Sequence, residues 1–208
     1  MKKISADDIL SYDKRYRTNF INTISGFKSA SLVATVNLEG VTNLAIFSQI
    51  LHIGANPPLL GILFRPHTVV RHTLENILST TEFTINHINE DILKRAHHTS
   101  ARWEQSEFDA CGLTPDFGTT VCAPYVRESP VQIGCKLVER QDIQANGTVL
   151  IIGQIVEIRV PENIVHDDGF IDLEMAGSLC ALGLDSYHST TKVARLSYAK
   201  PDRHPEEI

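Results

Sequence analysis

Short strands follow one another closely near the start of this sequence. Residues 29–37 alternate so that Ser31, Val33, Thr35 and Asn37 fall on one face and Leu32, Ala34 and Val36 on the other. Glu39-Gly40 then leads into a second expected strand at 42–48, and Asn56-Pro57-Pro58 precedes a third at 59–64. Three strands in so short a stretch favour an antiparallel barrel or sandwich.

The rest of the chain continues the β pattern, with one long polar excursion. Residues 131–141 and 148–160 are expected to form two long strands joined at Asn146-Gly147, with a bulge or bend at Gly153. Residues 89–124 form the excursion, a length typical of a lid, a binding loop or a dimer contact. The other expected elements are a helix at 73–79 capped by Thr73, a strand at 82–88, helices at 91–97, 106–111 and 173–177, and a turn at 167–169.

Composition narrows the class of protein. The 208 residues are 42% hydrophobic, which suits one domain over 1–208 with a core at about 26–187 and a polar tail at 200–208. The net charge of −6 comes from scattered residues, which disfavours a nucleic-acid partner. Neither a signal peptide nor a membrane span is expected, so the cytoplasm is the predicted compartment. The four cysteines, Cys111, Cys122, Cys135 and Cys180, lack the spacing of a zinc site and are expected to be reduced thiols.

A basic loop precedes the helix expected at 73–79. Arg65, Arg71, His72 and Thr73 lie at or near the helix start, where free backbone N–H groups and the positive end of the helix dipole favour an anion such as a phosphate. The alternative is that both arginines are solvated loop charges and that Thr73 only caps the helix. An arginine at the end of a buried strand, as Arg65 is, favours an anionic partner.

A second polar cluster, His97-His98-Thr99-Ser100, ends the helix expected at 91–97. Adjacent histidines diverge on a helix, so no metal site is predicted. The cluster could hydrogen-bond a ligand, or it could simply cap the helix C-terminus. The sequence contains no G-x-S-x-G elbow, which disfavours a hydrolase, and no Rossmann or P-loop glycine motif.

The residues of these segments resemble the flavin reductase-like, flavoredoxin-type family. The resemblance covers about 26–187 and includes Asn43-Leu44-Ala45-x-Phe47-Ser48, the Asn-Pro-Pro-Leu turn, Arg71-His72-Thr73-Leu74-x-Asn76-Ile77, Glu82-Phe83-Thr84-Ile85-Asn86, His98-Thr99-Ser100-Ala101, Ser106-Glu107-Phe108-Asp109-x-Cys111-Gly112-Leu113-Thr114 and Ala123-Pro124-x-Val126-x-Glu128-Ser129-Pro130-Val131. It implies an FMN-binding split β-barrel of antiparallel Greek-key type. It also implies a homodimer with the flavin at or near the subunit interface, and NADH or NADPH as the reductant.

The resemblance also implies roles for individual residues. Backbone groups of Ala45 and Phe47 and the Ser48 hydroxyl, on the strand that begins at Asn43, would contact the isoalloxazine and ribityl chain. Arg65, Arg71, His72 and Thr73 would hold the phosphate, while His98, Thr99, Ser100 and Tyr187 would approach the ring or the substrate. Two positions depart from the family pattern, because Ile46 stands where many relatives have Pro and His72 where many have Asp. Ser189-Thr190 after Tyr187 is also atypical.

The predicted function is therefore that of an FMN-binding oxidoreductase that transfers hydride from NAD(P)H to flavin. In such a protein the cofactor carries the chemistry, which fits the absence of a catalytic triad motif, and no catalytic residue is predicted. A downstream electron acceptor or an oxygenase is a further partner to consider. Two alternatives stay open: a non-catalytic FMN protein that carries electrons, and another split-barrel protein, such as a pyridoxamine phosphate oxidase or a haem-binding protein.

Overall fold

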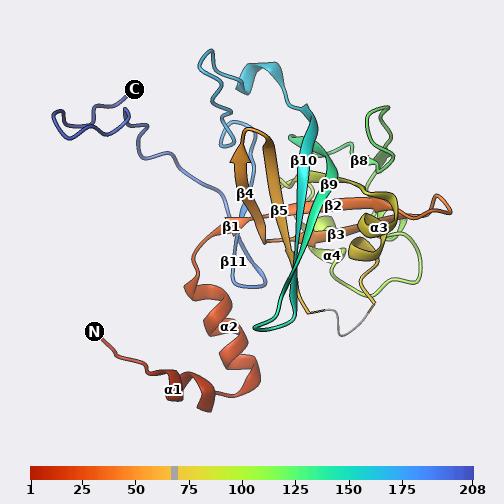
Figure 1. The fold of residues 1–208 in the computed structure, drawn as a ribbon, viewed down its shortest axis with the longest axis horizontal. Coiled ribbons are helices and arrows are strands. Elements are labelled where there is room, and N and C mark those ends of the chain that lie inside the picture. Colours follow the sequence, from red (N-terminus) through yellow and green to blue (C-terminus); the bar gives the residue numbers. More distant parts are fainter. Residues whose placement is uncertain (67–69) are drawn as a thin grey trace.

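Strands dominate the computed structural model, which describes residues 1–66 and 70–208 (Figure 1). The strands are β1 (Lys28–Ser29), β2 (Ser31–Val36), β3 (Thr42–Phe47), β4 (Ile50–Ala55), β5 (Pro58–Phe64), β6 (Glu82–His87), β7 (Pro115–Asp116), β8 (Tyr125–Val126), β9 (Gln132–Ile143), β10 (Thr148–Arg159), β11 (Cys180–Leu182) and β12 (Ser186–His188). The helices are α1 (Ala6–Ser11), α2 (Lys14–Ile24), α3 (His72–Thr80), α4 (Leu93–His98), α5 (Glu107–Cys111) and a 3-10 turn, η1 (Glu162–Ile164).

Seven of the strands form one antiparallel sheet in the order β3-β2-β6-β9-β10-β5-β4. The β9–β10 hairpin lies in the middle of this order and joins β6 on one side to β5 on the other. A second, small sheet has the order β1-β11-β12. Its strand β1 directly follows the two N-terminal helices in the chain. The prediction of a mainly β, antiparallel fold with added helices is confirmed.

Two hydrophobic cores lie on opposite faces of β2. Val33 joins one core with Phe64, Phe83 and residues of α3, whereas Leu32 and Ala34 join another core that includes residues of α4 and α5. The alternation predicted for residues 29–37 is therefore correct, although both faces are buried rather than one. Strand β2 is a central wall with packed side chains on either side.

The long hairpin agrees closely with its sequence signals. Gly147 takes φ +73° at the turn, a conformation that glycine adopts without strain. A register shift falls between Ile152 and Gly153, which confirms the expected bulge. A Cβ at Gly153 would lie 2.4 Å from Phe83 Cζ, so the bulge admits only glycine there without rearrangement.

Several elements differ from the sequence-based expectations. Strand β4 was not predicted, and it forms a hairpin with β5 at the edge of the large sheet. The predicted helix at 173–177 is wrong: these residues form consecutive turns, in which the Asp172 carboxylate accepts the Met175 N–H at 3.0 Å. Arg71 rather than Thr73 occupies the N-cap position of α3, so the predicted cap is also wrong.

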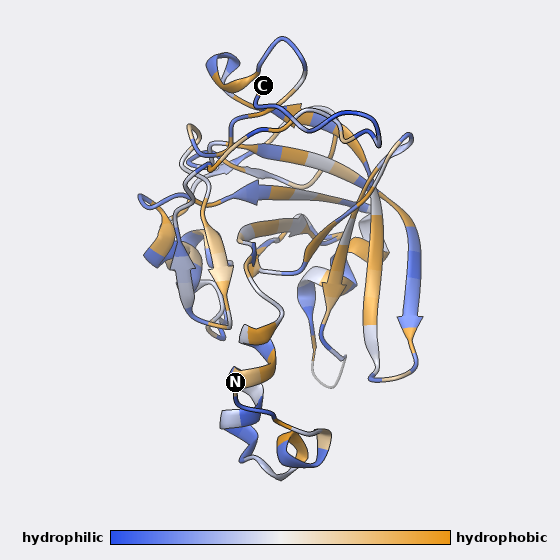
Figure 2. Ribbon diagram, turned by 90° about the vertical axis from the view of Figure 1, so that its left-hand side faces the viewer, coloured by the Kyte–Doolittle hydropathy of each residue, from blue (hydrophilic) through white to orange (hydrophobic). Residues whose placement is uncertain are grey.

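An N-terminal arm, residues 1–27, leaves the body of the molecule (Figures 1 and 2). Sequence reasoning predicted neither α1 nor α2, although both carry local start signals. Ser5 and Asp8 form a capping box on α1, and the Asp13 carboxylate caps α2. Neither helix has a buried residue. No helix in the described part of the chain is both long and apolar enough to cross a membrane.

Candidate functional site

The predicted phosphate-binding residues gather around the N-terminus of α3, beside β2 and β3 (Figure 1). Arg65 and His72 are exposed, and Arg71 is half-buried. The Arg71 guanidinium donates to the Pro66 carbonyl through Nε at 3.2 Å and Nη2 at 3.1 Å. This bond holds the arginine between the end of β5 and the start of α3. The predicted loop also contains residues 67–69, which lie outside the described residues.

Among residues 1–66 and 70–208, no side chain caps the start of helix α3. The first N–H groups of a helix have no intrahelical acceptor, and together with the helix dipole they form a positive end that attracts anions. In α3 these groups belong to His72, Thr73 and Leu74, and the next N–H, that of Glu75, bonds the Arg71 carbonyl at 3.1 Å. The first turn therefore offers backbone donors beside an arginine, a donor set suited to phosphate.

A buried polar network ties this helix to the sheet. Asn43 Nδ2 on β3 donates to Thr73 Oγ1 at 2.9 Å and lies 3.4 Å from Thr35 Oγ1 on β2. Asn76 Nδ2 donates to the same Thr35 hydroxyl at 3.0 Å. All four side chains are buried. The network brings together two predicted site residues, Asn43 and Thr73, and gives both a structural role.

Successive residues of β3 point their backbone polar groups alternately toward β2 and away from it. The Leu44 N–H donates to Glu107 Oε2 at 2.9 Å, so it points away from β2. In an antiparallel strand pair, every second residue points its N–H and C=O groups at the partner strand. Because Leu44 points away, the backbone polar groups of Ala45 and Phe47 point toward β2. The next outward N–H is that of Ile46, a position to which sequence reasoning gave no contact role. Ser48 lies half-buried at the bend that follows the strand.

Side chains at the two ends of this region are held by local contacts. The Phe47 ring packs edge-on against Phe64 with 5.1 Å between centroids. At the other end, Ser106, the N-cap residue of α5, shares a hydrogen bond of 2.7 Å with Thr42 on β3. With the bond from Leu44 to Glu107, this contact covers the first half of the outer edge of β3. Sequence reasoning did not identify this cover, because it joins residues more than sixty positions apart.

The second predicted cluster lies at the C-terminus of α4. The Thr99 and Ser100 hydroxyls each donate to a carbonyl three residues back, those of Ala96 and His97 respectively, at 2.7 Å. Both hydroxyls thus serve the helix end, as the capping alternative expects. The His98 ring packs edge-on against Trp103 with 4.8 Å between centroids.

His97, which was not among the predicted ligand contacts, pairs with Tyr187. His97 Nδ1 lies 2.8 Å from the Tyr187 hydroxyl, and the rings meet edge-on at 5.7 Å. Partial burial, with the charge of Asp185 as a smaller cause, raises the pKa of Tyr187, so this phenol stays protonated at neutral pH. The pair joins α4 to β12, and its 90-residue separation left no local sequence signal.

The predicted residues form an α3 group (Arg65, Arg71, His72 and Thr73) and an α4 group (His98, Thr99, Ser100 and Tyr187, with His97). The two groups lie on elements that pack against the same strand, but no direct bond between described residues joins them. Helix α4 packs against β3, whose other neighbours include α3. Over residues 1–66 and 70–208, no hydrogen bond or ring contact joins the α3 group to the α4 group. The same part of the chain contains no cluster of three metal-ligating side chains.

Comparisons with known proteins agree on one family. The model of the flavin reductase like domain matches residues 24–175. A solved structure from Shewanella frigidimarina NCIMB 400, described as a proposed flavin reductase with split barrel domain, is 47% identical; the match covers 96% of this chain and 100% of that one with a TM-score of 0.92. The structure of 2-nitrobenzoate 2-nitroreductase from Pseudomonas fluorescens is 25% identical, with 96% and 98% coverage and a TM-score of 0.80. An uncharacterized Aquifex aeolicus protein is 28% identical over 73% of this chain and 78% of its own length.

Proposed function

The chain belongs to the flavin reductase like domain family, and on that basis we propose that it binds FMN and catalyses hydride transfer from NADH or NADPH to the flavin. The observation that supports a phosphate-bearing flavin is the uncapped N-terminus of α3 with Arg71 at its N-cap position. Backbone donors and a guanidinium together suit a phosphate monoester better than a neutral ligand.

The residues around α3 would hold the phosphate end. Arg71, fixed by its bonds to the Pro66 carbonyl, would place its remaining donors toward the phosphate. The first-turn N–H groups would complete the set. Arg65 is exposed near this helix end and would add positive charge, and the exposed His72 ring would be a further hydrogen-bonding group. Thr73 would act mainly by positioning the helix, because its buried hydroxyl already accepts from Asn43.

The ring end would lie against β3 and α4. The outward N–H of Ile46, the Ser48 hydroxyl and the His97–Tyr187 pair are the polar groups that this part of the chain offers. Bound FMN supplies the hydride-accepting ring system, which no side chain can provide. The protein would orient that ring, exclude water from one face and present hydrogen-bond donors to its polar edge.

We also propose that the protein works as a homodimer with the flavin near the subunit interface. In one chain, the α3 group and the α4 group form walls at two sides of β3, and no hydrogen bond links the two groups within the described residues. A second chain would close such a site. The nicotinamide would then enter from the side that the second chain leaves open.

The absorption spectrum and a turnover assay test the proposal directly. Purified protein loaded with FMN should show flavin bands after gel filtration, and it should oxidise NADH or NADPH steadily when free FMN is added. Bleaching of bound flavin without turnover would favour the electron-carrier alternative. A protein that retains no flavin and oxidises neither nicotinamide would refute the proposal.

Arg71 provides a sharper test of the phosphate site. Arg71→Ala should weaken FMN binding by roughly 10- to 100-fold, the effect of losing a charge-assisted hydrogen bond. The same variant should leave riboflavin binding within about threefold of wild type, because riboflavin has no phosphate. Fluorescence titration measures both ligands, and Arg203→Ala, an exposed arginine in the C-terminal segment, serves as the control. Equal losses for FMN and riboflavin would mean that Arg71 only holds the loop.

A further inference from the structure

The N-terminal arm carries an apolar face that is largely exposed in the described part of the chain. Tyr16, Phe20 and Ile24 recur every four residues along one side of α2, with Ile21 beside them. Tyr16 is 55% exposed and Ile24 70% exposed. Polar residues such as Thr18 and Asn19 occupy the opposite side. An amphipathic helix of this kind in a globular protein normally buries its apolar side.

Local contacts between aromatic side chains and one helix cap order the arm. Tyr12 packs against Tyr16 at 4.7 Å and Phe20 at 5.8 Å, and the Asp13 carboxylate caps α2. These contacts set the direction of the arm, but α2 has only 11 residues. Isolated helices of that length are marginal in water, so a partner surface is needed to stabilise them.

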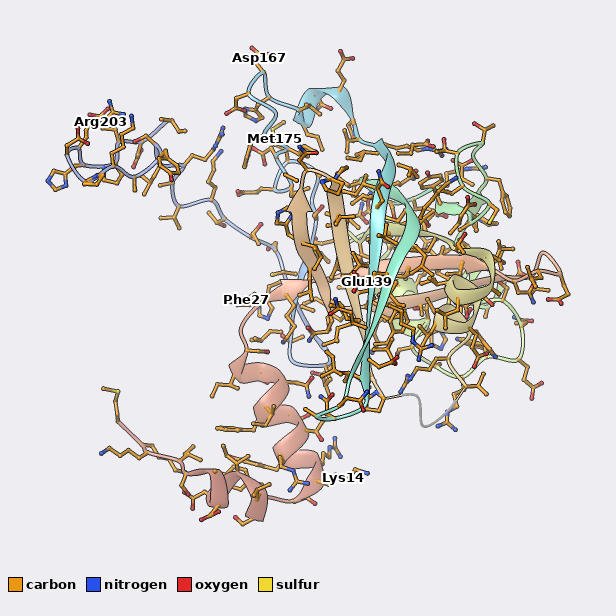
Figure 3. The ribbon with its side chains drawn as sticks, viewed as in Figure 1. Lys14, Phe27, Glu139, Asp167, Met175 and Arg203 are labelled. Carbon is orange, nitrogen blue, oxygen red and sulfur yellow. The ribbon has the colours of Figure 1, made fainter. Side chains whose placement is uncertain are left out.

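The base of the arm is fixed to the body. A Cβ at Gly183 would lie 3.1 Å from Thr23 Oγ1, which shows how closely the end of α2 approaches the β11–β12 turn. The Phe27 ring packs edge-on against His188 of β12 with 5.0 Å between centroids. Figure 3 shows Phe27 at the junction and Lys14 far out along the arm. The arm therefore projects from the body at a defined place.

Charge distinguishes the arm from the body. Residues 1–27 carry five lysines and arginines against three aspartates, whereas residues 28–208 carry 14 basic and 22 acidic residues. A basic arm on an acidic body attracts the body of another copy of the same chain. A second copy therefore offers both the charge and the symmetry that an exchanged arm needs.

An acid-lined groove begins at the foot of the arm. Two adjoining hollows of about 340 and 490 Å³ share Glu90, Leu179 and Ser189 in their walls. His188, against which Phe27 packs, lines the larger hollow, and Asp91 and Glu174 line the smaller. A two-fold interface uses the same surface on both copies, so an arm and a groove that adjoin on one chain can pair reciprocally with the groove and the arm of a second copy.

We propose that α1 and α2 form a dimerisation arm, which lies along the acidic groove of a second copy while the second copy's arm lies along the first. The proposal rests on the homodimer of the proposed function and names the element that makes it. The apolar side of α2 would be buried against Leu93 and the exposed Met175, and the basic residues of the arm would meet Glu90 and Asp91 at the rim.

Matched pairs of variants on the two sides of α2 test the apolar contact. Ile21→Glu combined with Ile24→Glu places two charges on the apolar side, and Thr18→Glu combined with Asn19→Glu places the same two charges on the polar side. Sedimentation equilibrium on the full chain measures the dimer dissociation constant. The first pair should raise this constant at least about 100-fold and the control pair by less than about tenfold. Both should keep the far-ultraviolet circular dichroism of wild type.

A second pair of variants tests the receiving groove. Glu90→Lys should weaken the dimer by roughly tenfold or more, whereas Glu139→Lys, on the exposed β9–β10 hairpin, should leave it unchanged. If wild type is a dimer that the Ile21→Glu, Ile24→Glu variant preserves, the arm proposal is wrong and the homodimer stands. If wild type is a monomer, and its arm instead binds phosphatidylserine vesicles, the arm proposal and the homodimer proposal are both wrong. NAD(P)H oxidation, measured separately, decides the reductase activity in either case.

Discussion

Thr73 shows how a residue of the proposed ligand site can also have a structural role. Its hydroxyl is the acceptor for the buried Asn43 amide, so Thr73→Val keeps the shape but removes that acceptor. We expect the free energy of unfolding to fall by about 1–2 kcal/mol, the cost of a poorly satisfied buried donor. Urea denaturation measures the change, and Thr190→Val, at an exposed site, is the control. Unchanged stability would restore Thr73 to a purely ligand-binding role.

His87 couples the stability of the protein to pH. Burial lowers its pKa to about 4, and its Nδ1 lies 3.0 Å from the Ser178 hydroxyl. The unfolded chain therefore binds the proton at a higher pH than the folded chain, so stability falls as pH drops from about 6.5 to about 4. Between pH 7 and 4.5, wild type should lose about 2 kcal/mol more than His87→Gln. Parallel pH profiles in urea titrations would contradict this.

The sequence predicted residues of the candidate site but not their contacts. Helix-start chemistry indicated Arg71 and Thr73, and the resemblance to a known family indicated Asn43. The bond between Asn43 and Thr73, like the pairing of His97 with Tyr187, joins residues far apart in the chain. Such contacts depend on which strands become neighbours, and no local pattern specifies that.

At the scale of elements, the bulge in β10 makes a specific prediction. A Cβ at Gly153 would approach Phe83 Cζ and Cε1 at 2.4 and 2.9 Å, so Gly153→Ala must displace the Phe83 ring from its core. We expect a loss of about 1–3 kcal/mol, typical of overpacking. Gly54→Ala in β4, where a Cβ would meet only the Pro57 carbonyl at 3.6 Å, should be tolerated. Thermal unfolding compares the two, and similar melting temperatures would exclude steric conflict at the bulge.

The elements that sequence reasoning found are those with a strong local period. Strands β6, β9 and β10 and helices α3 to α5 were predicted to within a few residues because alternation or helical spacing runs through each of them. Strand β4 was missed because Ile50, Leu51 and Ile53 do not alternate and the strand lies at a sheet edge. The short strands β11 and β12 hold their shape through pairing with β1 and each other.

At the scale of the whole molecule, composition and strand spacing were enough to predict the fold class. Two cores on the two faces of β2 explain why a mainly β chain of this size needs helices, since α3 covers one core while α4 and α5 cover the other. The sheet order could not be predicted, because β5 pairs with β10 across some 90 residues of intervening chain. The resemblance to a known family indicated the split-barrel architecture, which periodicity alone left open, but not the order of the strands.

The central position of the β9–β10 hairpin has a consequence for biosynthesis. The strands β2, β3 and β6 emerge from a ribosome early and can pair among themselves, as can β4 and β5. These two groups meet only through β9 and β10, which are translated last among the seven strands. Until then, each group presents an unpaired strand edge to the surrounding solvent. Assembly of the seven-stranded sheet therefore ends with the insertion of a single hairpin, and chaperone protection of these edges is needed most just before that hairpin leaves the exit tunnel.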